Sequence, residues 1–415
     1  MRLDAWRLRR CILALLFGLL GLAGLVAAGC GPSGGRSGWA GTVDTLPGGA
    51  VRVHSPAAGA WDSASAWRAE EVLRIGAASG GGPGMFSEIT AVAIDGMDRV
   101  WALDREDHVV KVFDRNGRFV RQIGGEGGGP GEFADPIGLA FDPDGDVWVC
   151  DPTNGRYAVF DTTGARVKSY RREIGGYRIP WPGTFTDGGI LYDLAFLPSE
   201  GDVGFRGVLV GYRPDGDRLT PVDSVPIPPS PFSAGEQQFE FQSGDSRMMV
   251  GIPWAPGLEW WFDRSGTLWF GRSDRYRIFE RHPGGDTLRV VERDWTPVPV
   301  TERDREDNGV LRYIREHDLK PDLSRLPDTK PAFRSFRSDG RGDLWVEVPT
   351  PAGADSAVAD VFGPDGRYLG ALRLPPHFGL PAAAFRGDRV CAPAAGDAGV
   401  PQIVCLQVER PALSR

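Results

Sequence analysis

Three short stretches of the sequence combine arginine with acidic, amide or hydroxyl residues: Arg105–His108, Thr153–Arg156 and Arg272–Arg275. Arginine presents a planar fork of N–H donors that suits carboxylates and phosphates. If these stretches meet in space, we expect a small anionic ligand to bind to Arg156, Arg272, Arg275, His108 and Asn154. The alternative is that each arginine pairs with an aspartate or glutamate near it.

The sequence offers little support for a metal site or a catalytic centre. It contains five histidines, and His108 alone lies in a stretch of this kind, so a zinc site of three imidazoles is not expected. The three asparagines that follow residue 30 are too few for a calcium site rich in asparagine. No serine–histidine–aspartate order or cysteine–histidine pair emerges. We therefore assign no catalytic residue, no metal and no cofactor other than a lipid.

Cysteine usage points to an oxidising compartment. Cys391 and Cys405 lie on predicted neighbouring strands near the C-terminus, where a disulfide is one expectation and two buried thiols the other. Cys150 then has no partner and is predicted to be a core thiol.

The first 30 residues read as an export signal. Four arginines within the first ten residues precede an apolar run that ends at Ala27-Ala28-Gly29, directly before Cys30. This ending resembles a bacterial lipobox, which implies that residues 1–29 are removed and that Cys30 carries a lipid. A plain cleaved signal and an uncleaved anchor are the alternatives. Residues 30–66 would form a flexible tether and an N-terminal segment, and Gly31 after Cys30 favours the outer membrane.

The charge distribution argues against nucleic acid as a partner. The formal net charge is −8, and no basic block follows the signal. The partners that we expect are the membrane, through the lipid, and either an envelope protein or a small anionic ligand.

An internal repeat indicates the fold that must position these residues. Landmarks of the first copy, from Gly82-Pro83-Gly84 to Trp101 and Asp114, recur 47 residues later, from Gly129-Pro130-Gly131 to Trp148 and Asp161. A period of this length is typical of a propeller or solenoid, because one unit cannot bury its apolar face alone. Each copy contains short strands and an Asp/Gly turn before the tryptophan, as in Asp142–Trp148, where we expect the aspartate to cap its own backbone.

Six blades account for the rest of the chain. Five are continuous, at residues 87–124, 134–171, 183–225, 258–295 and 332–373. The sixth has three strands within 382–408, and its outer strand is Val72–Gly76, which aligns with Val120–Gly124 of the first blade. The sequence thus predicts an all-β, six-bladed β-propeller over residues 67–411, in which an N-terminal strand closes the last blade and protects its edge.

The stretch from Gly127 to Phe133, continuing through Trp148 to Asp161, resembles the NHL repeat. The resemblance implies a six-bladed propeller lipoprotein of the bacterial envelope, a group mostly without an assigned activity. Some NHL-like propellers are lyases or lactone hydrolases, so such an enzyme is the alternative function.

Two insertions interrupt the repeat, at about 226–257 and 296–331. The first reads as a β-hairpin and the second as a helical segment with a cap at Thr301-Glu302-Arg303-Asp304. Both replace connections between blades, which share one face of a propeller. We therefore expect a lipid-anchored module that binds a ligand or protein on the face carrying the insertions.

Overall fold

The computed structural model describes residues 38–77, 82–174, 181, 183–198, 205–232, 234–243, 246–282, 285–396 and 399–411. These belong to one compact unit of the chain, residues 36–415. The predicted signal at 1–29, the lipid-bearing Cys30 and most of the glycine-rich tether lie outside the described residues. Within the described part, no helix is both long and apolar enough to cross a membrane.

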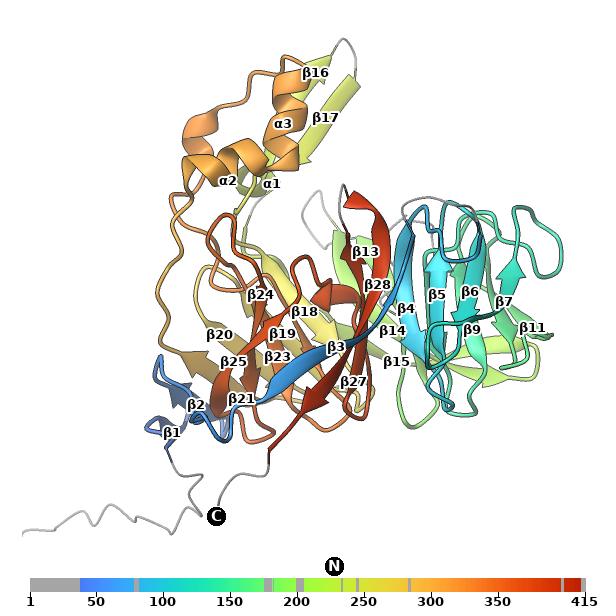
Figure 1. Cartoon of the computed structure of the whole chain (residues 1–415), viewed down its shortest axis with the longest axis horizontal. Helices are drawn as coiled ribbons and strands as arrows, with labels where there is room; N and C mark the ends of the chain where they lie inside the picture. The colour runs from blue at the N-terminus through green and yellow to red at the C-terminus, as the bar shows by residue number, and fades with distance from the viewer. Residues whose placement is uncertain are drawn as a thin grey trace, which may run out of the picture. The chain divides into compact units, whose positions relative to one another are not determined.

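Six sheets contribute four antiparallel strands each to the ring (Figure 1). The first blade contains β4 (Ile89–Ile94), β5 (Val100–Asp104), β6 (Val109–Phe113) and β7 (Phe119–Gly124). The second contains β8 (Gly138–Phe141), β9 (Val147–Asp151), β10 (Arg156–Phe160) and β11 (Arg166–Arg171). The third contains β12 (Thr184–Phe185), β13 (Leu191–Pro198), β14 (Phe205–Asp215) and β15 (Arg218–Pro226).

The remaining blades follow the same order from the inner to the outer strand. The fourth contains β18 (Leu258–Phe262), β19 (Leu268–Arg272), β20 (Arg277–Arg281) and β21 (Thr287–Arg293). The fifth contains β22 (Ser335–Ser338), β23 (Leu344–Val348), β24 (Ala357–Phe362) and β25 (Tyr368–Leu374). The sixth contains β26 (Ala384–Arg386), β27 (Arg389–Ala395), β28 (Pro401–Glu409) and β3 (Arg68–Ile75).

The N-terminal strand closes the ring, as predicted. β3 pairs antiparallel with β28, in a register that sets Ile75 opposite Ile403 and Arg68 opposite Glu409. The chain thereby completes its last blade with a strand from the other end of the domain. The six-bladed, all-β architecture is confirmed.

Apolar cores lie between neighbouring blades and account for the arrangement of the sheets. Alternate residues of each strand face the next blade, so every sheet buries one face against its neighbour. Each of the six cores combines side chains from two adjacent blades. In order around the ring, starting between the first and second blades, one example pair per core is Trp101 and Phe160, Trp148 and Phe185, Tyr192 and Phe262, Trp269 and Phe336, Trp345 and Leu406, and Val100 and Ile403.

Aspartates close the first turn of several blades. One carboxylate oxygen of Asp142 accepts a hydrogen bond from the backbone N–H of Asp146, and the other accepts one from the indole Nε1–H of Trp148. Both donor–acceptor distances are 2.9 Å. Asp95 and Asp263 bind Trp101 and Trp269 in the same way, at 2.9 and 3.0 Å. These aspartates therefore support the blades, as predicted.

An N-terminal hairpin extends the fourth blade. It consists of β1 (Thr42–Thr45) and β2 (Val51–Ser55), and β2 runs parallel to β21 with Val53 opposite Val291. Sequence analysis predicts no strand here, because the partner strand lies more than 200 residues away and no turn joins the two. The segment between residues 42 and 55 is thus part of the propeller.

The two insertions form one small unit, here called the inserted subdomain (residues 234–252 and 301–326). It contains α1 (Ala234–Gln237), β16 (Gln238–Ser243), β17 (Ser246–Gly251), α2 (Glu302–Asp307), α3 (Gly309–Glu316) and η1 (Leu323–Arg325). Its core joins both insertions through Phe239, Phe241, Ile252, Leu311, Ile314 and Leu326. The predicted hairpin and helical segment are confirmed, although the helix divides at Asn308, whose side chain caps α3.

Candidate functional site

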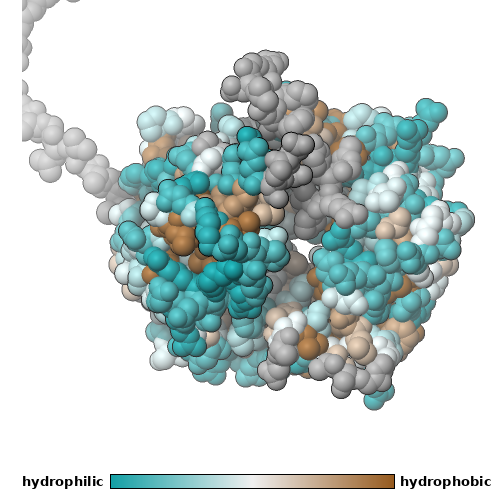
Figure 2. All heavy atoms as spheres, turned by 90° about the horizontal axis from the view of Figure 1, so that it is seen from above, coloured by the Kyte–Doolittle hydropathy of each residue, from teal (hydrophilic) through white to brown (hydrophobic). Residues whose placement is uncertain are grey.

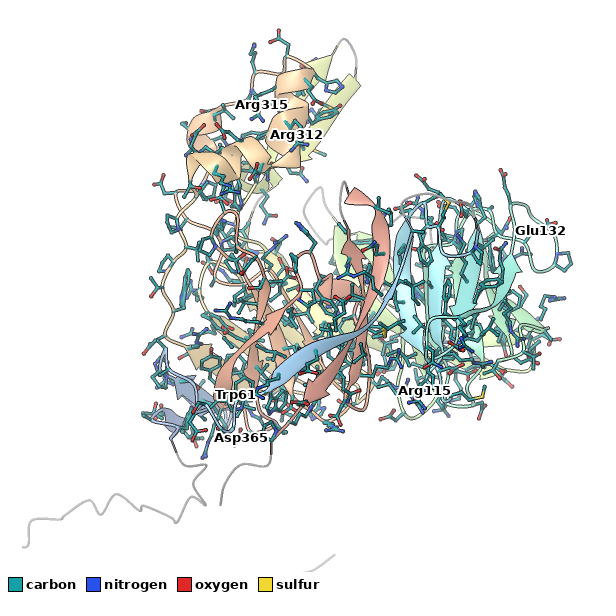
Figure 3. All side chains as sticks on the ribbon, viewed as in Figure 1. Trp61, Arg115, Glu132, Arg312, Arg315 and Asp365 are labelled. Carbon is teal, nitrogen blue, oxygen red and sulfur yellow. A yellow bond between two sulfur atoms is a disulfide. The ribbon has the colours of Figure 1, made fainter. Side chains whose placement is uncertain are left out.

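Two of the predicted anion-binding residues hold a loop of the second blade. Arg156 donates to the carbonyl oxygens of Gly129 and Glu132, both at 2.8 Å. Asn154 Nδ2 donates to Gly127 O at 2.9 Å. Figure 3 shows Glu132 at the right-hand edge of the propeller, far from Arg312 and Arg315 of the inserted subdomain at the upper left. The structure therefore gives Arg156 and Asn154 a supporting role in the 127–132 loop.

The two arginines of the fourth blade share one carboxylate. Arg272 Nη2 lies 2.6 Å from Asp274 Oδ2, and Arg275 Nε lies 3.4 Å from Asp274 Oδ1. The Arg272 guanidinium also stacks over the ring of Phe232, 5.0 Å from its centroid. These contacts match the alternative reading, in which each arginine pairs with an acidic neighbour.

His108 occupies a tight turn before β6. Its backbone has φ of 55°, and its carbonyl accepts the N–H of Gly125 at 2.9 Å. Its Nδ1 is buried and has no hydrogen-bond partner among the described residues. His108, Arg156 and Arg272 thus belong to the first, second and fourth blades, and the contacts described above join each of them to residues other than these three.

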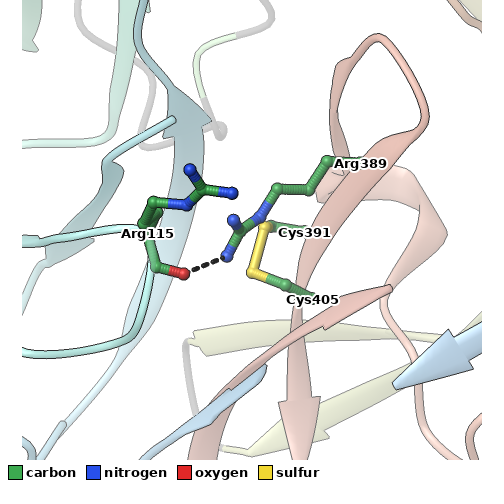
Figure 4. The surroundings of a disulfide bond; sticks show 4 residues. All are labelled: Arg115, Arg389, Cys391 and Cys405. Atoms are coloured by element: carbon green, nitrogen blue, oxygen red, sulfur yellow. Dashed lines mark hydrogen bonds between the residues drawn. A yellow bond between two sulfur atoms is a disulfide. The ribbon is translucent and has the colours of Figure 1, made fainter. Parts of the chain in front are cut away.

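The sixth blade carries a disulfide. Cys391 of β27 and Cys405 of β28 are directly opposite in the antiparallel register and their sulfur atoms are bonded (Figure 4). Beside this bond, Arg389 donates to the carbonyl oxygen of Arg115, at 3.0 Å, and so joins the sixth blade to the first. Cys150 is buried as a free thiol, and burial raises its pKa well above the usual value. Among the described residues, no group of three or more His, Cys, Asp or Glu side chains is arranged to hold a metal.

A pocket of about 610 Å³ lies between the inserted subdomain and the fourth and fifth blades. We call it the subdomain pocket. The sequence did not predict it, and its described walls come from six separate parts of the chain: residues 254–259, 273, 304–308, 330–334, 347–357 and 376–378.

A buried ion pair fixes the roof of this pocket. Lys330 Nζ lies 2.5 Å from Asp304 Oδ1 of α2 and 2.7 Å from the carbonyl oxygen of Thr350. Asp304 also completes the capping box of α2 with Thr301. One lysine therefore ties α2 to the loop between β23 and β24. Gly353 in that loop has φ of 73°, a left-handed backbone that favours glycine.

Two bulky residues in the pocket wall have left-handed backbones. Trp254 has φ of 61° and His377 has φ of 58°. Such conformations cost about 1–3 kcal/mol in a non-glycine residue, and they concentrate at ligand sites. Their presence on two sides of one pocket favours a functional role for it.

Among the described residues of the pocket, Glu259 has the most strongly shifted pKa. It lies on the inner strand β18, opposite Gly271, and no described residue forms a hydrogen bond or ion pair with its carboxyl group. Burial raises its pKa to about 7, and the nearby Glu347 carboxylate adds to this effect, while Arg337 and Arg334 oppose it. Near neutral pH the carboxyl group therefore exists in both protonation states.

The other charges of the pocket have partners. Asp304 is paired with Lys330, while Glu347 lies 3.7 Å from Arg334 and accepts the hydroxyl of Ser335 at 2.9 Å. Among the described residues of the lining, the ionisable group without a partner is thus the carboxyl group of Glu259. The sequence does contain a signal for it, because Glu259 is a single acidic residue inside the apolar run Leu258–Phe262.

Comparison with known proteins agrees with the fold. The family model DUF5128, described as a 6-bladed β-propeller, matches residues 77–171, which include the first two blades. No curated protein matches the sequence. The NHL resemblance stays a prediction.

Several solved structures resemble the chain at low sequence identity. A protein from Bacteroides fragilis, proposed to be exported, shares 11% identity over 87% of this chain and 100% of its own, with a TM-score of 0.45. A catalytically inactive virginiamycin B lyase from Staphylococcus aureus shares 11% over 82% and 99%, with a TM-score of 0.42. A PQQ-bound aldose sugar dehydrogenase from Streptomyces coelicolor shares 12% over 83% and 99%, with a TM-score of 0.39.

Proposed function

We propose that this protein is a ligand-binding module of the bacterial cell envelope, and that its ligand binds in the subdomain pocket. The observation that carries the proposal is the unpartnered, largely desolvated carboxyl group of Glu259 in a pocket of about 610 Å³. A buried carboxylate without a partner is unfavourable, so a ligand that supplies a donor or a positive charge is stabilised there.

The ligand class follows from the lining. Phe333, Phe378 and Trp254 provide apolar surface, and Glu259 provides the acceptor for a cationic group. A compact molecule with an ammonium or guanidinium group satisfies both, because aromatic faces also attract cations. This proposal replaces the small anionic ligand expected from the sequence, since Arg156, Arg272 and Arg275 already have partners in the protein.

A panel of small probes tests the ligand class. We expect agmatine and butylamine to raise the melting temperature of the protein, whereas glucose should leave it unchanged. Binding of the two amines should be on the order of tenfold tighter at pH 8 than at pH 6, because Glu259 ionises in between.

Variants assign the effect to the pocket. Glu259→Gln should abolish the amine effect, and Glu240→Gln, at an exposed position of the inserted subdomain, should leave it unchanged. An amine effect of equal size in Glu259→Gln, or at both pH values, would contradict this assignment.

Attachment to a membrane through Cys30 is a separate part of the proposal. It is supported by the arginine-rich start, the apolar run and Ala27-Ala28-Gly29-Cys30. Fractionation of cells grown with a labelled fatty acid tests it: the label and membrane retention should both be lost in Cys30→Ser. Uptake of the label by Cys30→Ser would exclude the lipoprotein assignment.

An enzyme is the second candidate function, and the pKa of Glu259 favours it. A carboxyl group with a pKa of about 7 can both accept and donate a proton at neutral pH. A lactonase-like hydrolase or a lyase would use it as general base or acid. Hydrolysis of dihydrocoumarin by the full chain, lost in Glu259→Gln and kept in Glu240→Gln, would support an enzyme, and equal rates in both variants would exclude this role.

A further inference from the structure

A second pocket, of about 240 Å³, lies on the axis of the ring, and we call it the axial pocket. All six blades contribute an inner strand, or the segment leading into it, through Thr90, Leu139, Trp181, Trp261, Arg337 and Ala382. The described residues that line it are all different from those that line the subdomain pocket. Figure 2, which looks along this direction, shows an opening near the middle of the ring.

Arg337 gives this pocket its charge. It lies on β22, its Nη1 donates to Phe336 O at 2.9 Å, and its guanidinium stacks 3.9 Å from the ring centroid of Trp261. Among the described residues, no carboxylate lies within 4.0 Å of it. Burial lowers its pKa to about 10, an effect that Glu347 and Glu259 oppose, so the group is still cationic at neutral pH. A half-buried guanidinium without a direct counter-ion is an attractive site for an anion.

The rest of the wall suits an anion with an apolar part. The described lining includes no aspartate or glutamate, and Ala91, Val92 and Leu139 present apolar surface. The wall also holds donors: Thr90 Oγ1, Trp181 Nε1 and Trp261 Nε1 are buried, with no hydrogen-bond partner among the described residues. The blade tryptophans Trp101, Trp148 and Trp269 differ, because their indoles donate to turn aspartates.

Two glycines keep the Trp181 ring near the axis. A Cβ at Gly183 would come within 1.7 Å of the ring, and a Cβ at Gly138 would lie 2.8 Å from Trp181 Cβ. Neither position can carry a side chain while Trp181 holds this place. Gly138 at the start of β8 and Gly183 directly before β12 thus leave the space that the Trp181 ring occupies in the wall of the axial pocket.

We propose that the axial pocket binds a small carboxylate with a short apolar tail. The carboxylate pairs with the guanidinium of Arg337, and the tail packs against Ala91, Val92 and Leu139. The volume, equal to about eight water molecules at ~30 Å³ each, limits the tail to a few carbons or one aromatic ring. This site is independent of the proposed function and of the subdomain pocket.

Ligand-observed NMR on the purified full chain tests the proposal, with acetate, butyrate and benzoate as probes and with nitrate and butylamine for comparison. Butyrate or benzoate should bind saturably in the millimolar range or tighter, and more tightly than nitrate. Arg337→Gln should weaken binding at least tenfold, and Arg337→Lys less, because it keeps the charge but loses the fork. Arg341→Gln, at an exposed turn of the same blade, should bind as the wild type does.

Three results would overturn the proposal: no saturable carboxylate binding, equal binding in Arg337→Gln, or nitrate binding as tight as that of butyrate. If Arg337→Gln does not fold, Ala91→Leu serves instead, because it narrows the pocket and keeps Arg337. Ala91→Leu should then weaken benzoate binding at least fivefold, and unchanged benzoate binding would contradict the site.

Discussion

At the residue scale, the inner strands β18 and β22 carry a half-buried carboxyl group, Glu259, and a half-buried guanidinium, Arg337, that interact electrostatically. Glu259 has a pKa of about 7 and Arg337 a pKa of about 10, and burial is the main cause of both values. Each residue favours the charged form of the other, yet Glu259 lines the subdomain pocket and Arg337 lines the axial pocket. One pair of inner strands thus carries the main ionisable group of each pocket.

The raised pKa of Glu259 predicts that it reduces stability above neutral pH. Below about pH 4.5 the carboxyl group is protonated in both the folded and the unfolded chain, so it has no effect. Between pH 4.5 and 7 the unfolded chain ionises while the folded chain does not, and stability falls. Glu259→Gln should thus be more stable than the wild type at pH 8, by up to about 3 kcal/mol, and similar to it at pH 4.5.

Urea denaturation of both chains at the two pH values measures this difference. Glu240→Gln is the control, since its side chain is half exposed and should not change stability with this pH dependence. A stability difference between Glu259→Gln and the wild type that is the same at pH 4.5 and pH 8 would show that Glu259 titrates normally.

At the element scale, the inserted subdomain depends on one buried ion pair for its position. Lys330 is 7% exposed and joins Asp304 of α2 to the loop after β23. Without the ammonium group, Asp304 would remain buried and unpaired, which costs about 3–5 kcal/mol. The roof of the subdomain pocket should therefore separate from the blades before the blades themselves unfold.

Lys330→Met should increase hydrogen exchange in α2, α3 and the β16–β17 hairpin, and leave β4–β11 unchanged. Lys320→Met is the matched control within the same insertion, because Lys320 and Asp318 form a highly exposed pair worth about 0–1 kcal/mol. Replacing both buried partners, in Asp304→Leu/Lys330→Met, should recover part of the loss, since no unpaired charge is left. Unchanged exchange in Lys330→Met would mean that the apolar core of the subdomain alone positions it.

At the scale of the whole molecule, closure by β3 makes the two ends of the domain interdependent. β3 supplies Ile75 to the core between the sixth and first blades, and its backbone covers the edge of β28. An exposed edge of this length pairs readily with other chains. The ring should thus be stable only when residues before the first blade are present.

A chain that starts at residue 82 should aggregate or melt at least about 10 °C lower than the full mature domain. A chain that starts at residue 57, which lacks β1 and β2 but keeps β3, should lose much less. The measurements are calorimetric melting and light scattering. Equal melting temperatures for the two truncated chains would show that closure by β3 contributes little.

The sequence alone determined the parts of this protein that local patterns encode. The 47-residue period, the aspartate turns before Trp101, Trp148 and Trp269, and the alignment of 72–76 with 120–124 predict the blades and their closure. These signals are local because a strand alternates every two residues and a tight turn needs particular residues at fixed positions. The hairpin and the helical segment were predictable for the same reason.

Only the tertiary structure decided the candidate site. The subdomain pocket joins residues between 254 and 378, and the pKa of Glu259 depends on burial by segments far from it in the sequence. The parallel pairing of β2 with β21 and the shared core of the two insertions likewise have no local signal. The sequence suggested that three arginines, Arg156, Arg272 and Arg275, could bind an anionic ligand. Whether a guanidinium is free to do so depends on which carbonyl or carboxylate group lies beside it in the folded chain.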